Sequence, residues 1–579
     1  MKITIAKTAG FCMGVRRAVE IALDQANTRN EPICTFGPLI HNPQVLALLE
    51  EKGIPVLHEI PEKGSGTVLI RAHGVPPESF EKLKAAGFTI VDATCPRVIK
   101  VQRIIRKYAK KGYSSIIIGD DDHPEVVGLN GYAEGRGHVV NSLETLAALP
   151  SFEKAIIVAQ TTQNTRFYDQ VKQWAESHHP HYEFFNTICD STEKRQNEIL
   201  SLAQASDAVV IVGGKNSGNT QRLAELAIQA GKPAWHIETE DELDMDQLAN
   251  AESIAISAGA STPNWIINRV QNHLVTQLMN TKKPHRKKLY EIQQLLLRTN
   301  LYLALGAGSL CYACSKLQGI EHGFLPAIVA MMYVLSMHIL NHLTAIRSAM
   351  YNEPERAEFY KKYKTQMTAL AITVGALGLF LVFRMGSFPF AILIVMSLMG
   401  LSYNLHLFPR GLGHNNYRKI SDIPGSKTFL IAVAWGVVTA LLPALSPRES
   451  FTLATIPAFL LSTGMVFART VFYDILDMQG DRIVGQRTLP LLLGAKKTIR
   501  LLKRILVGLL VILPVSSALG LISGLGYSLS LFPVMMLGLL FMYERDSDFY
   551  GFRLEFLLET LLILTGFIAL FWTLVTWLA

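Results

Sequence analysis

Long apolar runs in the second half of the chain place the strongest constraint on its fold. From about residue 300 onwards, runs near the ~20 residues needed to cross a bilayer follow one another. Before about residue 285 the sequence is mixed and polar. A chain of 579 residues is too long for one core. The sequence therefore predicts a soluble unit followed by a membrane unit.

The membrane unit is predicted to be an all-α polytopic domain with about nine spans. Basic residues gather in alternate loops between the apolar runs, and the positive-inside rule puts those loops and the first half in the cytoplasm. No cleavable signal sequence precedes the first strand-like run, and six cysteines are too few for a disulfide framework. We expect a protein of the cell (plasma or inner) membrane. The spans are expected at 300–318, 323–343, 366–384, 387–405, 428–446, 451–472, 504–522, 526–543 and 556–577.

The first half alternates short apolar runs with helical segments, which predicts an α/β fold. Each apolar run ends at small or polar residues, as buried parallel strands do, and parallel strands place ligands beyond their carboxyl ends. The five predicted strands begin at Thr67, Ser115, Ala155, Ala208 and Ser253.

Polar side chains follow these strands and one earlier turn. Imidazoles, hydroxyls, amides and one carboxylate together fit a small, anionic, oxygen-rich ligand. Each has a simpler interpretation: a histidine as a turn residue, Ser217 and Asn219 as helix N-caps, Glu125 as a first-turn carboxylate. The candidates are His41, His73, His123, Glu125, Thr161, Ser217, Gly218, Asn219 and Ser261. No phosphate-binding loop of the GxxxxGK[ST] type occurs, so nucleoside triphosphate chemistry is not indicated.

Three cysteines in turn-like settings suit an iron–sulfur cluster with one iron free of protein ligands. They are Cys12, Cys95 and Cys189, each near a break between apolar runs. The alternative is that they are buried core residues, a common role for free cysteine and the one we predict for Cys34.

The motifs around these residues resemble the 4-hydroxy-3-methylbut-2-enyl diphosphate reductases of the methylerythritol phosphate pathway of isoprenoid biosynthesis. The resemblance covers residues 1 to about 278 in family order. It lies in GFCMGVRRAV, GPLIHNPQV, IRAHGV, VDATCPRV, GDDDHPEV, AQTTQN, ICDSTEKRQ, GGKNSGNTQRLAEL and SAGASTP.

The resemblance implies three pseudo-equivalent α/β lobes around a [4Fe–4S] cluster on Cys12, Cys95 and Cys189. It implies that the substrate hydroxyl meets the open iron, that Glu125 delivers a proton, and that Thr161 relays it or orients the hydroxyl. Two electrons, from a ferredoxin or flavodoxin, and two protons would then give isopentenyl and dimethylallyl diphosphates. The diphosphate would be held by His41, His73, His123, Ser217, Asn219 and Ser261. Gly218 departs from relatives that carry a second serine there, and its N–H remains available.

The formal net charge of +8 does not indicate nucleic-acid binding, because the basic residues follow the membrane topology. The short basic segment at 281–288 is too small and lacks aromatics for such a site, and it fits anionic lipid. We predict domains at 1–280 and 299–579 joined by a basic juxtamembrane linker at 281–298.

Three carboxylates at the end of one predicted span are the chemical signal of the second half. Asp474, Asp477 and Asp481 have i, i+3, i+7 spacing, so a helix would present them on one face, where they can hold Mg²⁺ and through it a diphosphate. The alternative is a solvated helix end. Lys427, Arg482 and Arg487 add positive charge for a diphosphate.

The second half resembles the UbiA-type membrane prenyltransferases. The resemblance lies in YDILDMQGDRIVGQRTLPLLLG, with YNLHLFP and ISDIPGSK from a mid-protein loop. The family's first Asp-rich motif is degenerate: Asn341 is kept, while His342, Ala345 and Ala349 stand where carboxylates are expected.

Glu353 and Glu355, just downstream, are candidates to replace the missing carboxylates. The first hypothesis is therefore a reductase fused to a prenyltransferase-like domain. The alternative keeps the reductase and makes the second half a non-catalytic anchor or a prenyl-diphosphate-binding domain. A transporter or lipid-binding module is the third hypothesis, and the scarcity of charges within spans disfavours it. Cys311 and Cys314 are predicted to be packing residues.

Overall fold

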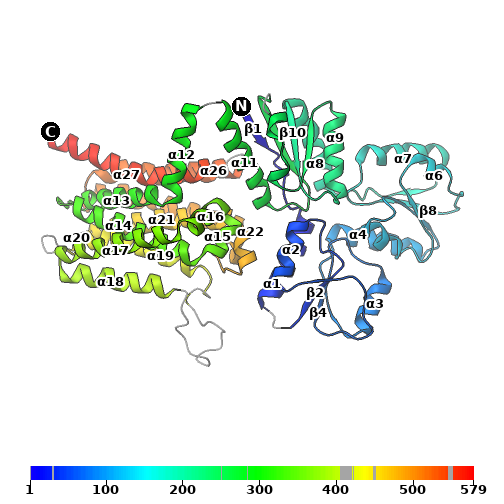
Figure 1. Cartoon of the computed structure of the whole chain (residues 1–579), viewed down its shortest axis with the longest axis horizontal. Coiled ribbons are helices and arrows are strands. Elements are labelled where there is room, and N and C mark those ends of the chain that lie inside the picture. Colours follow the sequence, from blue (N-terminus) through cyan, green and yellow to red (C-terminus); the bar gives the residue numbers. More distant parts are fainter. Residues whose placement is uncertain are drawn as a thin grey trace. The chain divides into compact units, whose positions relative to one another are not determined.

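The computed structural model of the chain divides into two units, Met1–Lys282 and Lys283–Ala579 (Figure 1). This division lies two residues after the predicted boundary at residue 280. The structure describes residues 2–28, 31–248, 251–282, 284–403, 420, 423–446, 451–545 and 552–578.

The first unit contains three separate four-stranded sheets, each entirely parallel. The predicted α/β fold with three lobes is therefore confirmed. The first sheet has the order β1 (Lys2–Ile5), β12 (Ser253–Ala258), β10 (Ala208–Val212), β11 (Ala234–Ile237). The second has the order β3 (Val56–Leu57), β2 (Ile33–Phe36), β4 (Thr67–Ile70), β5 (Thr89–Asp92). The third has the order β7 (Gly137–Val140), β6 (Ser114–Ile118), β8 (Ala155–Ala159), β9 (Glu183–Phe184).

The five predicted strands are all present, as β4, β6, β8, β10 and β12, and each is central in its sheet. Central strands such as β8 and β10 are buried along their whole length, because helices pack on both faces of a parallel sheet. The remaining strands are mostly edge strands. Two of them, β3 and β9, have only two residues each.

Helices connect the strands of the first unit. Several begin with proline or a capping side chain, as Asn42 caps α2 by accepting a hydrogen bond from the Val45 N–H at 3.0 Å. The helices are α1 (Met13–Thr28), α2 (Pro43–Glu51), α3 (Pro77–Ala85), α4 (Pro96–Ala109), α5 (Pro124–Asn130), α6 (Leu143–Ala147), α7 (Thr165–His178), α8 (Asp190–Ala205), α9 (Gly218–Gln229), η1 (Glu240–Glu242), α10 (Met245–Leu248) and α11 (Asn264–Lys282).

The described residues of the second unit form helices and the turns that connect them, without a strand. The predicted linker forms α12 (Pro284–Arg298). It is followed by α13 (Leu301–Leu317), α14 (Phe324–Thr344), α15 (Ile346–Asn352), α16 (Pro354–Lys362), α17 (Lys364–Met385) and α18 (Ser387–Ser402). Then come α19 (Ser426–Gly436), the π-helical turn η3 (Val437–Leu441), α20 (Leu442–Ala444), α21 (Thr455–Leu476), α22 (Met478–Val484) and α23 (Leu489–Leu493). The chain ends with α24 (Ala495–Ala518), α25 (Leu525–Leu529), α26 (Leu531–Arg545) and α27 (Phe552–Leu578).

Among the described residues of this unit, seven helical segments are long and apolar enough to cross a membrane, and two shorter apolar helices, Leu301–Leu317 and Ser387–Ser402, accompany them. Each of the nine predicted spans overlaps one of these nine segments. Helix α13 is short but mostly buried, which suits an internal position in a bundle. The mid-protein loop motif lies outside the described residues apart from Tyr403, Ile420 and residues 423–427.

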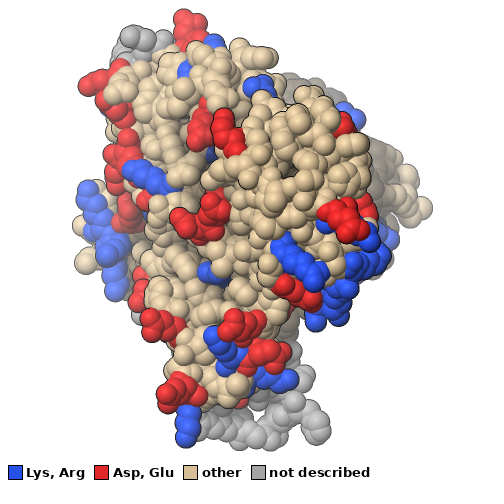
Figure 2. All heavy atoms as spheres, turned by 90° about the vertical axis from the view of Figure 1, so that its right-hand side faces the viewer, with Lys and Arg blue, Asp and Glu red and all other residues tan. Residues whose placement is uncertain are grey.

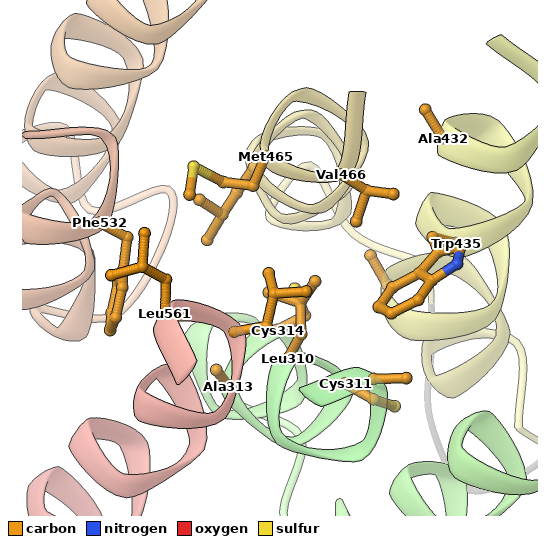
Figure 3. Packing of buried hydrophobic residues seen from close by; sticks show 14 of the residues in the cluster. Leu310, Cys311, Ala313, Cys314, Ala432, Trp435, Met465, Val466, Phe532 and Leu561 are labelled. Atoms are coloured by element: carbon orange, nitrogen blue, oxygen red, sulfur yellow. The ribbon is translucent and has the colours of Figure 1, made fainter. Parts of the chain in front are cut away.

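A large apolar core, part of which Figure 3 shows, holds the second unit together, and a smaller apolar cluster contains Leu335, Tyr360 and Met367. Cys311 and Cys314 lie on α13 in this core, fully buried, among side chains such as Val466 and Trp435. The prediction that both cysteines are packing residues is confirmed. Cys34 on β2 is only half-buried, although its side chain does pack against the core of the second sheet.

Basic and acidic side chains are interspersed on the face of the molecule seen in Figure 2. Among the described residues on that face, no extended area carries positive charge alone. The net charge of +8 is thus not gathered into a basic groove on this face.

Candidate active site

The polar candidate residues occupy equivalent positions in the three sheets of the first unit. In each sheet the two central strands end at candidate ligand-binding side chains. His41 and His73 come from loops after β2 and β4, and His123 and Thr161 from loops after β6 and β8. Ser217 and Ser261 come from loops after β10 and β12. Because the carboxyl ends of parallel strands meet at one edge, each lobe contributes a pair.

The cysteines follow the edge strands instead. Cys12 follows β1, Cys95 follows β5 and Cys189 follows β9, which are edge strands of the first, second and third sheets. Each cysteine also stands at the start of a helix, since Cys12 precedes α1 and the other two are the N-cap residues of α4 and α8. A helix N-terminus favours a negatively charged thiolate.

One cavity of the first unit brings all these residues together. It is lined by each of the twelve residues predicted for the reductase site: Cys12, His41, His73, Cys95, His123, Glu125, Thr161, Cys189, Ser217, Gly218, Asn219 and Ser261. Contacts between lobes close it. The Ser261 hydroxyl donates to the His41 carbonyl at 2.9 Å, and the Arg17 guanidinium donates to the Thr94 carbonyl at 3.0 Å.

The cysteine end of the cavity fits an iron–sulfur cluster. Gly14 leaves the space that the Cys95 thiol occupies: a Cβ on Gly14 would lie 2.3 Å from Cys95 Sγ. The Val15 N–H donates to Cys12 Sγ at 3.4 Å, as amides do to cluster sulfurs. Burial raises the pKa of the Cys95 thiol, so that thiol keeps its proton at neutral pH until a metal displaces it.

Three histidine rings form the opposite end of the cavity. The ring centroids of His41, His73 and His123 are 4.7 to 5.7 Å apart. Burial is the main cause that lowers the pKa of each, to about 4 for His123, and Arg71 adds to the shift of all three. The rings are therefore neutral at pH 7. His123 Nδ1 accepts a hydrogen bond from the Glu125 N–H at 3.1 Å, which leaves its Nε2 to carry the proton.

Several buried polar atoms in this cavity lack a hydrogen-bond partner among the described residues. They include His41 Nε2, His73 Nδ1 and Asn219 Nδ2. Ser217 is the N-cap residue of α9 but its side chain makes no capping hydrogen bond, so its hydroxyl is not used by the helix. Buried donors without partners cost free energy unless a ligand satisfies them. The donor set fits an anion with many oxygens. The three histidines also have the spacing of a metal site, with ligand atoms within 4.8 Å of one another.

Glu125 and Thr161, which are joined by two hydrogen bonds, lie between the cysteine end and the histidine end of the cavity. The Thr161 N–H donates to Glu125 Oε1 at 2.7 Å, and the Thr161 hydroxyl donates to Oε2 at 2.9 Å. Glu125 is 2% exposed, and burial raises its pKa to about 7 although the hydrogen bonds from Thr161 oppose the shift. A carboxyl group with this pKa can give up a proton at neutral pH.

The sequence analysis missed Arg97, which lines the cavity, and three arginines that lie outside its lining but contact the loops of the first unit. The charge of Arg71 helps to lower the pKa of the three histidines, as described above. Arg195 is 3% exposed and donates to the carbonyls of Ala258 and Gly10 at 3.0 and 2.6 Å. Arg222 donates to the Thr162 carbonyl at 2.6 Å and to Asp120 Oδ2 at 2.8 Å. Arg71, Arg195 and Arg222 lie inside the motifs quoted above, and this position is the sequence signal that could have identified them.

A second, larger cavity of about 720 Å³ lies in the helical unit, lined by Asp474, Asp477 and Asp481. Helix α21 ends at Leu476 and Asp481 belongs to α22, so the three carboxylates do not lie on one continuous helix as predicted. They nevertheless line one cavity. Two carboxylates are already engaged: the Thr428 hydroxyl donates to Asp474 at 2.6 Å and Asn352 Nδ2 donates to Asp481 at 3.0 Å.

Of the three basic residues predicted to accompany these carboxylates, two line the cavity and one does not. Lys427 and Arg487 line the cavity, and Arg482 is not among its lining residues.

The degenerate first motif lines the same cavity, which Asn341, His342, Ala345 and Ala349 all border. Of the two candidate replacements, Glu353 lines the cavity, whereas Glu355 is ion-paired with Arg298 and does not. Glu353 accepts a hydrogen bond from Arg356 at 2.6 Å, and Arg356 also donates to Glu555 at 2.5 Å.

The fold and cavity of the first unit define a class of protein, an α/β enzyme with three cysteines at one end of its site and an anion-binding set at the other. The sequence profile of the family described as "LytB protein" matches residues 3–275. The 4-hydroxy-3-methylbut-2-enyl diphosphate reductase of Alkaliphilus oremlandii is 43% identical over 273 residues, which are 47% of this chain and 98% of that protein. The chain therefore belongs to this family of reductases, and the prediction of a reductase in its first half is confirmed.

Solved structures are similar to each half. A structure of (E)-4-hydroxy-3-methyl-but-2-enyl diphosphate reductase is 39% identical and covers 48% of this chain and 99% of its own, with a TM-score of 0.39. A UbiA homologue from Archaeoglobus fulgidus, bound to GPP and Mg²⁺, is 14% identical and covers 47% of this chain and 98% of its own, with a TM-score of 0.35. Membership of the reductase family follows from the sequence identity to its members.

Proposed function

We propose that Cys12, Cys95 and Cys189 hold the [4Fe–4S] cluster of the reductase. Their convergence on one cavity, each at a helix N-terminus, supports this assignment. Such a cluster supplies electrons singly and offers an iron with an open position. The electron donor would be a ferredoxin or a flavodoxin.

The histidine end of the cavity would bind the diphosphate. Neutral imidazoles, hydroxyls and amides donate hydrogen bonds to phosphate oxygens, and the N-terminus of α9 adds a favourable dipole. The unpartnered nitrogens of His41, His73 and Asn219 are the main support. The proposed set is His41, His73, His123, Ser217, Gly218 through its N–H, Asn219 and Ser261.

Glu125 would supply the proton for the leaving hydroxyl, with Thr161 as the relay. The protonated carboxyl can donate to the Thr161 hydroxyl oxygen, and that hydroxyl can in turn donate to the substrate. The raised pKa of Glu125, about 7, supports a donor that is loaded at neutral pH. The convergence of all twelve predicted residues is the single observation on which the assignment depends.

The test is turnover of the full-length protein, purified without oxygen in detergent and given the allylic hydroxy diphosphate with a reductant. We expect Cys95→Ser to lose iron and product together. Glu125→Gln should keep the iron and lose most of the product. Cys34→Ser, a half-buried cysteine on β2, is the matched control and should keep both. Full turnover in Glu125→Gln would contradict the proton-donor role.

We infer that the second half is a UbiA-like domain that binds a prenyl diphosphate through Mg²⁺ on Asp474, Asp477 and Asp481, with Glu353 in place of a lost carboxylate. The shared cavity supports this inference. The seven long apolar segments and the two shorter ones would together make nine spans in the cell membrane, with the reductase on the cytoplasmic side. A non-catalytic anchor is the alternative.

Binding of geranyl diphosphate separates these two hypotheses. We expect Mg²⁺-dependent binding to the wild-type protein and a loss of about tenfold or more in Asp477→Asn. The reductase site would be filled beforehand with excess substrate, so that only the second cavity reports. Absence of any Mg²⁺-dependent binding would favour the anchor.

A further inference from the structure

Arg195 is a buried guanidinium of the first unit that has no part in the function proposed above. It lies on α8, six residues after Cys189, and is 3% exposed. Its hydrogen bonds go to two backbone carbonyls, and among the described residues it forms no ion pair with a carboxylate. A buried charge without an opposite charge is costly, so the charge of Arg195 needs an explanation.

The two hydrogen bonds of Arg195 attach α8 to the loop that carries Cys12. The guanidinium donates to the Gly10 carbonyl at 2.6 Å, two residues before Cys12. It also donates to the Ala258 carbonyl, at the end of β12, at 3.0 Å. The Cys12 N–H in turn donates to the Ala260 carbonyl at 3.0 Å, in the segment that follows β12. One side chain therefore connects α8 with the two segments that hold Cys12.

Glu198 contacts the same loop about one turn further along α8. Its carboxylate accepts from the Lys7 N–H at 2.7 Å, and from the N–H and the hydroxyl of Thr8 at 2.9 and 2.5 Å. The loop is thus attached to α8 by two residues of that helix. Because Cys189 is the N-cap residue of α8, the same contacts also hold Cys189 in place relative to Cys12.

The charge of Arg195 lies within electrostatic range of two of the three cluster cysteines. Burial lowers the pKa of its guanidinium, and negative charge on Cys12, Glu198 and Cys189 opposes that shift. An arginine keeps its proton at neutral pH even when it is buried, so the charge is fixed. Six residues at 1.5 Å each put Arg195 about 9 Å from Cys189 along the axis of α8. Helical side chains lean toward the N-terminus, which here is the cysteine end.

We propose that Arg195 is the buried counter-charge of the iron–sulfur cluster and a positioning residue for Cys12 and Cys189. A cluster held by three thiolates is anionic, and each added electron increases its negative charge. A fixed positive charge in a buried site therefore favours the reduced form and raises the reduction potential. Arg195 acts through the cysteines and has no contact with the substrate. The inference rests on the cluster proposed above, whereas the attachment of α8 to the Cys12 loop does not.

The test measures the reduction potential of the cluster by anaerobic redox titration of the full-length protein in detergent, with iron per chain determined on the same sample. Arg195→Gln removes the charge and keeps an amide that can donate to one of the two carbonyls. We expect the equilibrium constant for one-electron reduction to fall about tenfold or more, and each tenfold lowers the potential by about 59 mV. Arg195→Lys keeps the charge, and its equilibrium constant should stay within about twofold of the wild-type value.

Lys194→Gln is the matched control for the loss of charge. Lys194 precedes Arg195 on the same helix and is exposed, so water and salt screen its charge. Its removal should change the equilibrium constant by less than about twofold. A purely structural role of Arg195 predicts a different pattern, in which Arg195→Gln and Arg195→Lys both lose iron or stability and any cluster still bound keeps the wild-type potential.

An iron-loaded Arg195→Gln with the wild-type potential would overturn the counter-charge and leave the cluster proposed above intact. If Arg195→Gln carries no iron or melts far below the wild type, Arg195→Lys becomes the deciding variant. Iron loading with an equilibrium constant within about twofold of the wild type then supports the proposal, whereas loss of iron or a tenfold lower constant overturns it. A wild-type protein that holds no cluster would refute the proposed function and this inference together.

Discussion

Gly14 is the position at which one added methyl group should empty the cluster site. It is the second residue of α1 and is buried. A Cβ there would lie 2.3 Å from Cys95 Sγ and 3.0 Å from Cys95 Cβ. Carbon–sulfur contacts need roughly 3.5 Å or more, so the thiol must move by about 1 Å. A misplacement of about 1 Å at a reacting centre costs on the order of 100-fold in activity.

The fold should survive Gly14→Ala. Alanine is favoured over glycine in a helix by about 1 kcal/mol, and overpacking at one site costs about 1–3 kcal/mol. We therefore expect a protein that melts within a few degrees of the wild type but carries much less iron. Iron per chain, cluster absorbance and anaerobic turnover would be measured on the same preparation.

Gly218→Ala is the control for this experiment. Gly218 lines the same cavity and begins a helix, but a Cβ there would meet no atom within 4 Å. This variant should keep its iron. If Gly14→Ala kept full iron and full turnover, the Cys95 thiol could not occupy the place described, and the cluster assignment would fail.

Three further outcomes follow from the reductase cavity. Because the pKa of Glu125 in the folded protein is raised to about 7, its carboxyl group holds the proton below pH 7 and loses it above. In a pH–rate profile, kcat/KM should therefore fall roughly tenfold per pH unit above about 7.5. Gly218→Ser should fit the open space beside Gly218, add one donor to the anion site and lower KM several-fold in steady-state assays. Arg195→Met leaves two buried carbonyls without donors, which should lower the free energy of unfolding by about 2–5 kcal/mol in denaturant titrations.

The sequence predicted five of the six central strands of the first unit, all but β2, and few of the edge strands. A strand such as β8, buried at every residue, forms a continuous apolar run that can be recognised without its neighbours. Strands β3 and β9 have two residues each and exist only because a longer neighbour offers its backbone. Their pairing depends on residues far away in the sequence, so the local sequence pattern cannot predict it.

The same distinction applies to the site. Histidines and cysteines could be predicted because their chemistry is specific and they stand where strands end. Arg195 could not, since its role depends on the carbonyls of Gly10 and Ala258, both more than sixty residues away. A basic residue within a helix is usually solvated, and although Arg195 lies inside a quoted motif, its burial and its two carbonyl partners are decided by distant parts of the chain.

In the second unit, sequence could not separate Glu353 from Glu355. They are two residues apart, and residues at that spacing face different sides of a helix. The fold turns Glu353 into the cavity, while Glu355 pairs with Arg298 on α12. The replacement for the lost carboxylates is therefore decided by packing between helices.

The two cavities should differ in their need for a divalent cation, because one would meet a diphosphate with neutral donors and the other with negative charge. The reductase cavity offers neutral donors and helix N-termini, whereas the second cavity offers the carboxylates of Asp474, Asp477 and Asp481, which repel an anion. Removing Mg²⁺ with EDTA should leave reductase turnover within about twofold, since Glu125 is the only carboxylate among the described residues that line the reductase cavity. With the first cavity filled by excess substrate, EDTA should weaken geranyl diphosphate binding by about tenfold or more, and added Mg²⁺ should restore it. Binding insensitive to EDTA would mean that Lys427 and Arg487 alone balance the diphosphate, and the aspartates would then have no metal to hold.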